Sequence, residues 1–363
     1  MGNRNVLLYP FSLIYGTITG FRNFLYDTGI LKQTEFRIPV ICIGNITVGG
    51  TGKTPHTEYI TELMQDKFKV AVLSRGYRRK SIGFRIASPS DNVKDIGDEP
   101  LQICRKFQNV TIAVDSDRVN GINSILKERP ETEVILLDDG FQHRRVLPGF
   151  VVLLTDFNRL MINDHLLPYG NLRENVRNMS RADIILITKS PENLSPIQRR
   201  IIVKEINKAP YQNLYFTLFE YKEPVAVFSI SAGKKVELNT TNNTQCGIVL
   251  LTGIANPEPL KEHLSGYFNE IVHVPFPDHH KFSDSDIVKV TEAFHNLSAQ
   301  VKYLITTEKD AVRLREFTNI AENLRSSAYY IPVGIKFLNN DKEEFDNLIV
   351  DYVRKNKRNN RIS

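Results

Sequence analysis

The chain has 363 residues, of which 41% are hydrophobic and 24% charged, as in a soluble globular protein with one large α/β domain or two of ordinary size. Its three cysteines, Cys42, Cys104 and Cys246, lie far apart, which argues against a disulfide framework or a cysteine metal site and predicts reduced core residues in a cytosolic protein. The net charge of +6 suits phosphate-bearing partners or an anionic membrane surface, and is too small to distinguish them.

The first predicted element is an amphipathic helix within residues 1–35. One apolar stripe recurs at alternating steps of four and three residues: Leu7, Phe11, Ile14, Ile18, Phe21 and Leu25. The apolar run from Val6 ends at Gly16, well short of the ~20 residues that span a bilayer, and Pro10 interrupts what would be a signal peptide. Two interpretations remain open, a helix packed on the domain and a helix lying in the membrane interface.

The second element is a buried strand, residues 40–43, that leads into glycines and ends in Gly-Lys-Thr. This pattern is typical of a phosphate-binding loop, in which backbone N–H groups at a helix N-terminus face a phosphate. The expected nucleotide-binding residues are Val48, Gly49, Gly50, Thr51, Gly52, Lys53 and Thr54. Lys53 would neutralise phosphate oxygens, and the Thr54 hydroxyl would hold Mg²⁺. The spacing departs from the common form at Thr47, where a glycine is usual.

A basic loop follows the next predicted strand, residues 70–73. It begins with Arg75 at the carboxyl end of the strand, the edge of a parallel sheet at which ligands bind. Arg75 is therefore a better candidate for a phosphate contact than Arg78, Arg79 or Lys80, for which a solvated turn explains the charge equally well.

Two acidic motifs follow. Asp98 and Glu99 precede Pro100 at the predicted start of a helix, where carboxylates also stabilise a helix without any further role. Asp138 and Asp139 end the predicted strand at residues 133–137, which is how a metal-associated acid of a phosphate-loop enzyme is presented, although such an aspartate also caps helices. Beside a nucleotide, one acid can bind metal while another accepts a proton.

The remaining pattern alternates strands and helices and predicts a mostly parallel α/β fold. Further strands are expected at residues 150–154, 184–188, 215–219, 248–252, 303–306 and 330–333. The predicted organisation is the N-terminal helix in 1–35, a P-loop nucleotide-binding domain in 36–210, an extended linker in 211–245, a smaller α/β domain in 246–353 and a basic tail in 354–363.

The second half of the chain contains Asp278-His279-His280. Adjacent histidines rarely bind one metal ion without further ligands, and no cysteine or third histidine is placed to complete a set. A histidine that tunes a catalytic carboxylate is the more plausible role, and a polar loop without a role is an equal alternative.

Taken together, the motifs resemble the tetraacyldisaccharide 4'-kinase family, the lipid A 4'-kinases of Gram-negative bacteria. The motifs are Val-Gly-Gly-Thr-Gly-Lys-Thr-Pro (48–55), Ser-Arg-Gly-Tyr (74–77), Gly-Asp-Glu-Pro (97–100), Leu-Asp-Asp-Gly-Phe-Gln-His (137–143), Leu-Arg-Glu (172–174), Phe-Pro-Asp-His-His (276–280) and Thr-Glu-Lys-Asp (307–310). The unusual loop spacing fits this family's own form.

The resemblance implies a P-loop NTPase-like, mostly parallel sheet flanked by helices, with a second, smaller α/β domain and the site in the cleft. It implies transfer of the γ-phosphoryl group of ATP, with Mg²⁺, to the 4'-hydroxyl of a tetraacylated glucosamine disaccharide 1-phosphate at the cytoplasmic face of the inner membrane. The N-terminal helix would then lie in the membrane interface, with Arg4, Arg22 and Lys32 near anionic lipid.

By motif position, Asp98 would be the general base, supported by His279 or His280, of which we favour His280. Lys53 and Thr54 take nucleotide and metal roles. Glu99, Asp138 and Asp139 would form the metal sphere, and Arg75, His143 and Arg173 would be further site members.

Two rivals belong to other classes. A regulatory or metal-insertion NTPase would hydrolyse nucleotide without phosphorylating a lipid, but the guanine-reading Asn-Lys-x-Asp element is missing from residues 187–191 and 307–310. A nucleic-acid-dependent ATPase would use the basic tail, but no nucleic-acid module accompanies it, so no nucleic-acid partner is expected.

Overall fold

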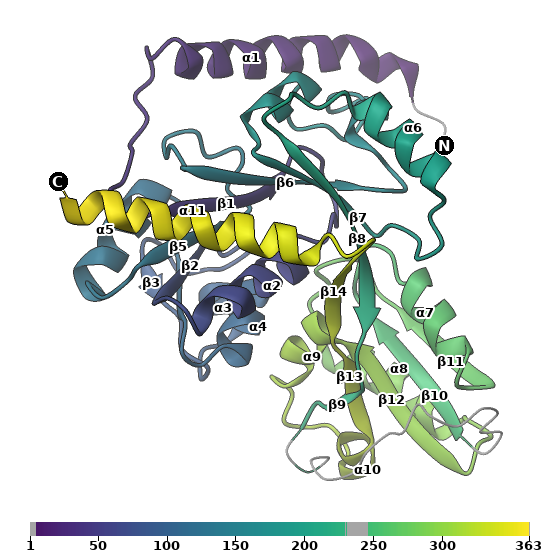
Figure 1. The fold of residues 1–363 in the computed structure, drawn as a ribbon. Coiled ribbons are helices and arrows are strands. Elements are labelled where there is room, and N and C mark those ends of the chain that lie inside the picture. The colour runs from purple at the N-terminus through teal and green to yellow at the C-terminus, as the bar shows by residue number, and fades with distance from the viewer. Residues whose placement is uncertain (1–4, 229, 231–245, 363) are drawn as a thin grey trace. The chain divides into compact units, whose positions relative to one another are not determined.

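The computed structural model describes residues 5–228, 230 and 246–362, with side chains as far as residue 356, and divides the chain into two compact units (Figure 1). Unit 1 comprises Met1–Ser90, Ile103–Phe219 and Ile335–Ser363, and unit 2 comprises Asp91–Gln102 and Glu220–Gly334. The boundary falls within one helix and two strands, so each unit is built from separate stretches of the chain.

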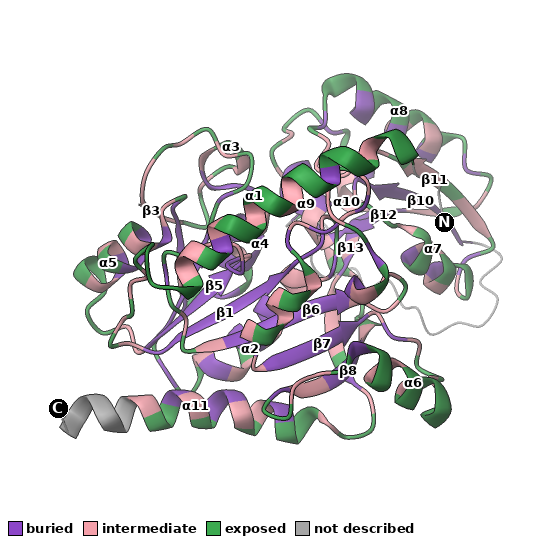
Figure 2. Cartoon of the chain, turned by 90° about the horizontal axis from the view of Figure 1, so that it is seen from above, coloured by how far each residue is buried: buried purple, intermediate pink, exposed green. Residues whose placement is uncertain are grey.

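Unit 1 is organised around a nine-stranded sheet in the order β14-β8-β7-β6-β1-β5-β2-β4-β3. The strands are β1 (Val40–Asn45), β2 (Val70–Ser74), β3 (Arg85–Ile86), β4 (Thr111–Val114), β5 (Val134–Asp138), β6 (Phe150–Asp156), β7 (Ile184–Thr188), β8 (Asn213–Tyr221) and β14 (Val333–Phe337). Pairing is parallel from β8 through β4, and the short β3 runs antiparallel to its neighbour β4. The central strands are buried on both faces, which explains their continuous apolar sequences (Figure 2).

Helices cover both faces of this sheet. On one face, α2 (Lys53–Gln65), the end of α4 (Asp98–Lys106) and α11 (Lys342–Ile362) share a core with Ile41 and Ile43. On the other face, α5 (Arg118–Glu128) packs in a core with Val40, and α6 (Pro196–Ile206) in a core with Cys42. Alternate residues of β1 therefore enter opposite cores, as strand geometry requires. The 3₁₀ turns Met161–Asn163 and Val176–Arg181 also belong to unit 1.

The N-terminal helix is α1 (Tyr9–Asp27), which follows a 3₁₀ turn at Val6–Leu8. It packs on unit 1 through polar side chains: Ser12 and Asn23 are its buried residues. The predicted apolar stripe is exposed, since Phe11, Ile14, Ile18 and Phe21 are all more than half exposed. Figure 2 shows that exposed residues run along much of α1. Of the helices that the structure describes, none is both long enough and apolar enough to cross a bilayer.

Unit 2 has a five-stranded sheet in the order β11-β10-β12-β13-β9, parallel except for β9. Its strands are β9 (Val225–Ala226), β10 (Cys246–Thr252), β11 (Glu270–Pro275), β12 (Val301–Thr307) and β13 (Ala328–Ile331). Its helices are α3 (Val93–Ile96), α7 (Glu258–Ser265), α8 (Asp284–His295), α9 (Glu308–Leu314) and α10 (Glu322–Ser326). The core on one face includes residues of α8, α9 and α10, and the core on the other includes residues of α7, so this unit also has three layers.

The units differ from the predicted domain ranges at residues 335–363, at residues 91–102 and within the predicted linker, which divides between Phe219 and Glu220. Residues 335–363 belong to unit 1, because Phe345, Ile349 and Val353 of α11 pack in the same core as α2. Residues 91–102 belong to unit 2 although they were expected in the nucleotide-binding domain. The predicted strand 330–333 is divided by Pro332, which ends β13 because it has no N–H to donate to a ladder.

The predicted linker at 211–245 lies partly outside the described residues, and its described part contains β8 and β9. The predicted basic tail continues the backbone of α11 as far as Ile362. All three cysteines are free and buried, as expected of core residues.

Candidate active site

The glycine loop has the backbone that its sequence predicts. Gly49 has φ +97° and Gly52 has φ +86°, and Gly52 is the N-cap residue of α2. A Cβ atom at Gly52 would lie 2.9 Å from the Phe219 ring, so a larger residue would both strain the backbone and clash. The predicted turn is therefore made by Gly49 and Gly52, with the first N–H groups of α2 beyond it.

Three residues at the ends of β6 and β7 hold the loop through its carbonyl oxygens. Arg159 donates from Nη2 to the carbonyl of Val48 (2.7 Å), and Thr188 donates from Oγ1 to that of Thr51 (2.8 Å). Lys189 Nζ donates to the carbonyl of Gly50 (2.5 Å) and to Asp156 Oδ2 (2.7 Å). Sequence reasoning missed these supports. Their position just after buried strands was the available signal.

Lys53 lies between an amide and an acid. Its Nζ is 3.4 Å from Asn45 Oδ1 and 3.7 Å from Asp139 Oδ1. The structure thus brings the predicted phosphate-binding lysine to the predicted metal-associated acids in unit 1.

Asp138 is buried and accepts hydrogen bonds on both oxygens. Thr57 donates from Oγ1 to Oδ1 (3.0 Å), and Ser74 donates from Oγ to Oδ2 (3.2 Å). These two hydroxyls fix the carboxylate in one orientation. Thr57 was not predicted as a site residue, although it lies one helical turn after Lys53 on α2.

Asp139 has φ +50°, a left-handed conformation that is uncommon for a residue other than glycine and that is enriched at functional sites. Burial alone would raise its pKa, but the nearby charges of Lys53 and Arg173 outweigh burial and lower the pKa. Arg173 Nη1 lies 3.4 Å from Asp139 Oδ2 and 3.4 Å from Gln142 Oε1. Asp139 Oδ1 is buried and accepts no hydrogen bond from the described residues.

These residues fit Mg²⁺, which usually binds one or two carboxylates together with phosphate oxygens and water. The Thr54 hydroxyl, Asp138 and the unsatisfied oxygen of Asp139 are hard oxygen donors within unit 1. In the part of the chain that the structure describes, no three histidine, cysteine or acidic side chains gather as a self-sufficient metal site. A nucleotide-dependent Mg²⁺ site is consistent with this donor set.

His143 also lies near the predicted cations. Burial, followed by the charges of Arg118 and Arg75, lowers the pKa of His143 to about 4, so the imidazole is neutral at pH 7. Arg118 is itself buried, and its guanidinium donates to the carbonyl of Asp115 and, at 3.3 Å, to that of Asp138. The charges of Arg75 and Asp139 thus both act on His143, and Arg173 contacts Asp139.

The second group of predicted residues lies in unit 2 around Asp98. Asp98 begins α4, and its Oδ2 accepts hydrogen bonds from His279 Nδ1 (3.1 Å) and from Arg313 Nη2, with Lys309 Nζ at 3.9 Å. Burial alone would raise the pKa of Asp98, but the His279 hydrogen bond and the charges of Lys309 and Arg313 lower it below its usual range. Asp98 is therefore a carboxylate at neutral pH.

The two histidines of this turn contact different carboxylates. His279 is the histidine that contacts Asp98, whereas His280 Nε2 lies 2.9 Å from Asp286 Oδ2 and its ring stacks on Phe276 at 4.8 Å. The tight turn explains the difference, because His279 has φ +57° and the His280 N–H donates back to the Pro277 carbonyl (3.0 Å). The two imidazoles consequently contact different carboxylates.

Lys309 is a central cation of this group and was not predicted as a site residue. Its Nζ lies 3.1 Å from His279 Nε2, 3.4 Å from Glu99 Oε1 and 3.4 Å from Asp278 Oδ1. Glu99, predicted for the metal sphere, pairs with Lys309 within unit 2, whereas Asp138 and Asp139 belong to unit 1.

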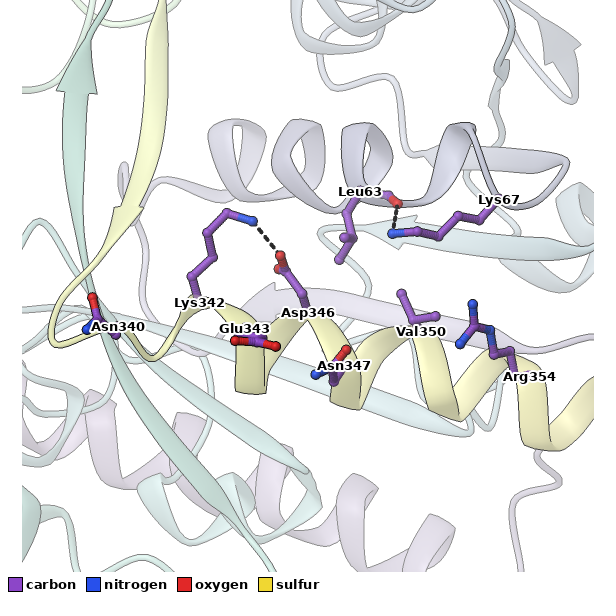
Figure 3. A pocket seen from close by; sticks show the side chains of 9 residues that line it. All are labelled: Leu63, Lys67, Asn340, Lys342, Glu343, Asp346, Asn347, Val350 and Arg354. Atoms are coloured by element: carbon purple, nitrogen blue, oxygen red, sulfur yellow. Dashed lines mark hydrogen bonds and ion pairs between the residues drawn. The ribbon is translucent and has the colours of Figure 1, made fainter.

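A surface groove of about 620 Å³ lies between the end of α2 and α11 in unit 1 (Figure 3). Lys342 and Asp346 pair across one helical turn there, and Lys67 donates to the carbonyl of Leu63. Leu63 follows Lys53 by ten residues along α2, about 15 Å at 1.5 Å per residue. The groove contains none of the predicted site residues.

Comparison with known proteins agrees with the motifs. A family model described as tetraacyldisaccharide-1-P 4'-kinase matches residues 4–354. The tetraacyldisaccharide 4'-kinase of Bacteroides thetaiotaomicron is 47% identical over 362 residues, covering 98% of this chain and 95% of that protein. The enzyme of the same name from Phocaeicola vulgatus is 46% identical over 361 residues, covering 99% and 98%.

Among solved structures, the "apo" form of LpxK from Aquifex aeolicus in complex with ATP is similar, with a TM-score of 0.72 and 27% sequence identity over 95% of this chain and 98% of that one. This likeness confirms the predicted fold class, and the sequence relatives confirm the family resemblance. The rival interpretation as a regulatory or metal-insertion NTPase is not favoured. The chain belongs to the tetraacyldisaccharide 4'-kinase family, and it is a phosphotransferase.

Proposed function

We propose that the chain transfers the γ-phosphoryl group of ATP to the 4'-hydroxyl of a tetraacylated glucosamine disaccharide 1-phosphate in lipid A biosynthesis, with Asp98 as the general base. The reaction follows from the family, and the assignment of residues rests on geometry. The observation that carries it is the buried Asp98 carboxylate with His279 at 3.1 Å, in a chain that also has a glycine loop ending in Lys53.

Unit 1 supplies nucleotide binding in this proposal. The loop from Val48 to Thr54 presents N–H groups at the start of α2 to phosphate oxygens, and Lys53 neutralises charge on the β and γ groups. Mg²⁺ held by Thr54, Asp138 and Asp139 would neutralise further charge on the phosphate oxygens.

Unit 2 supplies the group that receives the proton. Because its pKa is lowered, Asp98 is ionised at neutral pH and can accept a hydrogen bond from the sugar hydroxyl. His279 donates a hydrogen bond to the same carboxylate and orients it, while the Asp98 carboxylate takes the proton as the hydroxyl is phosphorylated. A weak base suffices because the transition state of phosphoryl transfer is loose, so the hydroxyl loses its proton late.

Arg75, His143 and Arg173 are proposed to meet the anionic substrate in unit 1. Arg75 is exposed at the end of β2, and its charge helps to lower the pKa of His143 to about 4. A neutral His143 can donate or accept one hydrogen bond without adding charge. Arg173 connects this group to Asp139.

We also propose that α1 binds the cytoplasmic face of the inner membrane, as a peripheral contact with anionic lipid. Its apolar side chains are exposed while its polar side is bound to unit 1, the arrangement that an interfacial helix requires. Arg22 donates to the carbonyl of Gln142 (2.7 Å), so it contributes to the contact of α1 with unit 1. Arg4 lies outside the described residues.

The test uses the full chain with γ-labelled ATP, Mg²⁺ and a tetraacylated disaccharide 1-phosphate in mixed micelles. Label should appear in the lipid, and Asp98→Asn should reduce this transfer by about 10²- to 10⁴-fold while ATP still binds. Release of free phosphate without labelling of the lipid would instead support the NTPase alternative. Near-native transfer by Asp98→Asn would remove Asp98 as the base.

A further inference from the structure

We propose that Arg313 is a positioning residue for phosphoryl transfer, because its guanidinium fastens the Asp98 carboxylate to the buried Asp310. This inference rests on the proposed role of Asp98 as the base. Arg313 lies in the last turn of α9 and is buried. Its Nη2 donates to Asp98 Oδ2, and its Nη1 donates to Asp310 Oδ1 at 3.0 Å.

Asp310 is held in place by its own hydrogen bonds. It is fully buried, and its Oδ2 accepts hydrogen bonds from the backbone N–H of Gly253 (2.8 Å) and from Thr307 Oγ1 (2.7 Å). Gly253 follows β10, and Thr307 ends β12. Asp310 is thus held at the ends of two central strands. Because Arg313 donates to both carboxylates, it holds Asp98 in a fixed position relative to Asp310.

Asp98 needs such a support because of its place in the chain. It begins α4, whose residues from Ile103 onward belong to unit 1, while residues 91–102 belong to unit 2. Residues 91–102 contact the rest of unit 2 through the Val93 N–H, which donates to Glu316 Oε1 (2.6 Å). Arg313 adds a contact on the side chain that is proposed to react.

The contact also decides which oxygen of Asp98 remains available. Arg313 and His279 both donate to Oδ2, whereas Oδ1 accepts the backbone N–H of Glu99 at 3.0 Å. A carboxylate oxygen can accept a second hydrogen bond, so Oδ1 is the atom left for the sugar hydroxyl. The planar guanidinium can donate from two of its nitrogens to two carboxylates at once, whereas a lysine has a single nitrogen.

The discriminating variant is Arg313→Lys, which keeps the charge but cannot bridge both carboxylates with fixed geometry. We expect kcat to fall by at least ~10-fold, because misplacing a reacting group reduces rate strongly, with KM for ATP and for the lipid within ~2-fold of the wild type. The matched control is Arg315→Lys. Arg315 donates to the carbonyl of Val227 (2.7 Å) and stacks over Tyr330, so kcat should be unchanged.

Arg313→Ala leaves two buried carboxylates without their cation and is expected to lower stability as well. Its use is chemical rescue: added guanidinium ion should restore part of kcat at saturating ATP and lipid, and methylammonium should restore less. Asp310→Asn, which keeps the hydrogen bond from Gly253, should lower kcat in the same direction as Arg313→Lys.

Three results would overturn the proposal. Arg313→Lys could have the same kcat as Arg315→Lys, or Arg313→Lys could change KM alone. Guanidinium could also fail to restore the kcat of Arg313→Ala in protein that circular dichroism shows to be folded.

Comparison with Asp98→Asn distinguishes a failure of this proposal from a failure of the proposed function. If Asp98→Asn is inactive and Arg313→Lys fully active, only the role of Arg313 fails. If Asp98→Asn is fully active, the proposed base fails first. In the double variant, the two losses should not add, because both act through one carboxylate.

Discussion

His279 and Asp98 lie 181 positions apart in the chain, yet Nδ1 of the histidine is 3.1 Å from Oδ2 of the aspartate. Because a carboxylate oxygen at neutral pH can only accept, Nδ1 carries the proton and donates it. We expect His279→Gln to lower kcat by about 10²-fold, since the carboxylate loses the imidazole that orients it for proton transfer. Steady-state assays of lipid phosphorylation at saturating ATP would measure the loss.

His280→Gln is the matched control for that prediction. His280 contacts Asp286 and Phe276, not Asp98, so its replacement should change kcat by less than ~3-fold. Equal losses in the two variants would show that the turn, and not the contact with Asp98, matters for rate.

Thr57→Val should weaken the response of the enzyme to Mg²⁺. The change removes the hydroxyl that donates to Asp138 Oδ1 and leaves the shape of the side chain nearly intact. Loss of a hydrogen bond to a metal-ligating group typically reduces metal affinity or activity by ~10- to 100-fold. We expect the Mg²⁺ concentration for half-maximal activity to rise by about 10-fold, with kcat partly recovered at high Mg²⁺.

Thr61→Val provides the control, because Thr61 is equally buried on α2 but donates to the carbonyl of Thr57 (2.7 Å). A Thr57→Val enzyme whose Mg²⁺ titration matches that of the wild type would argue against Asp138 as a ligand.

His56 should make stability depend on pH. Its Nδ1 donates to the carbonyl of Gly52 (2.7 Å), and its Nε2 accepts from Thr217 Oγ1 (3.0 Å). Burial lowers the pKa of His56 to about 4, whereas the unfolded chain has a value near 6.5. Between these values the unfolded state binds more protons, so the free energy of unfolding falls as pH drops from about 6.5 to 4, by up to about 3 kcal/mol.

His56→Asn keeps a donor for Gly52 and does not titrate. The variant should lose about 3 kcal/mol less than the wild type between pH 7 and pH 4, measured by urea unfolding at each pH. If His56→Asn has the slope of the wild type, His56 is not the titrating group.

Phe11, Ile14 and Phe21 should bind the protein to anionic vesicles. They are 59%, 59% and 61% exposed on the outer side of α1, so their replacement by serine removes no buried contact. The triple serine variant should lose at least ~10-fold in vesicle binding while its affinity for ATP is unchanged, because each inserted side chain contributes apolar burial. Vesicle co-sedimentation and ATP titration measure the two quantities.

The control replaces Ile197 and Ile201, which are 74% and 51% exposed on α6, by serine. Unchanged vesicle binding of the α1 variant, or an equal loss in the α6 variant, would count against α1 as the anchor.

The sheet strands could be predicted because burial on both faces leaves continuous apolar runs, as at residues 40–43 and 184–188. The membership of α11 in unit 1 could not, because an amphipathic helix is compatible with any apolar surface and only packing against α2 decides the choice. The same reason applies to α1, whose apolar stripe was recognisable but whose buried residues, Ser12 and Asn23, are polar.

The candidate site was predictable where one short motif carries the chemistry, as with Lys53 and Asp139. It was not predictable where the partner is remote. Arg313 reaches Asp98 across 215 positions, and nothing in the local sequence marks it. The choice between His279 and His280 depended on one backbone angle, the positive φ of His279. The presence of a histidine in the sequence does not predict a positive φ, so this choice could not be made from the sequence.

The attachment of α1 has a practical consequence for truncated proteins. Asn23 donates to the buried Glu174 (3.0 Å), and Tyr15 donates to the carbonyl of Arg173 (2.9 Å), the residue that reaches Asp139. Deleting the first 27 residues to improve solubility would therefore remove the exposed apolar side chains of α1 and also disturb the surroundings of Asp139. Low turnover of such a shortened protein would therefore not by itself show that membrane binding is needed for activity.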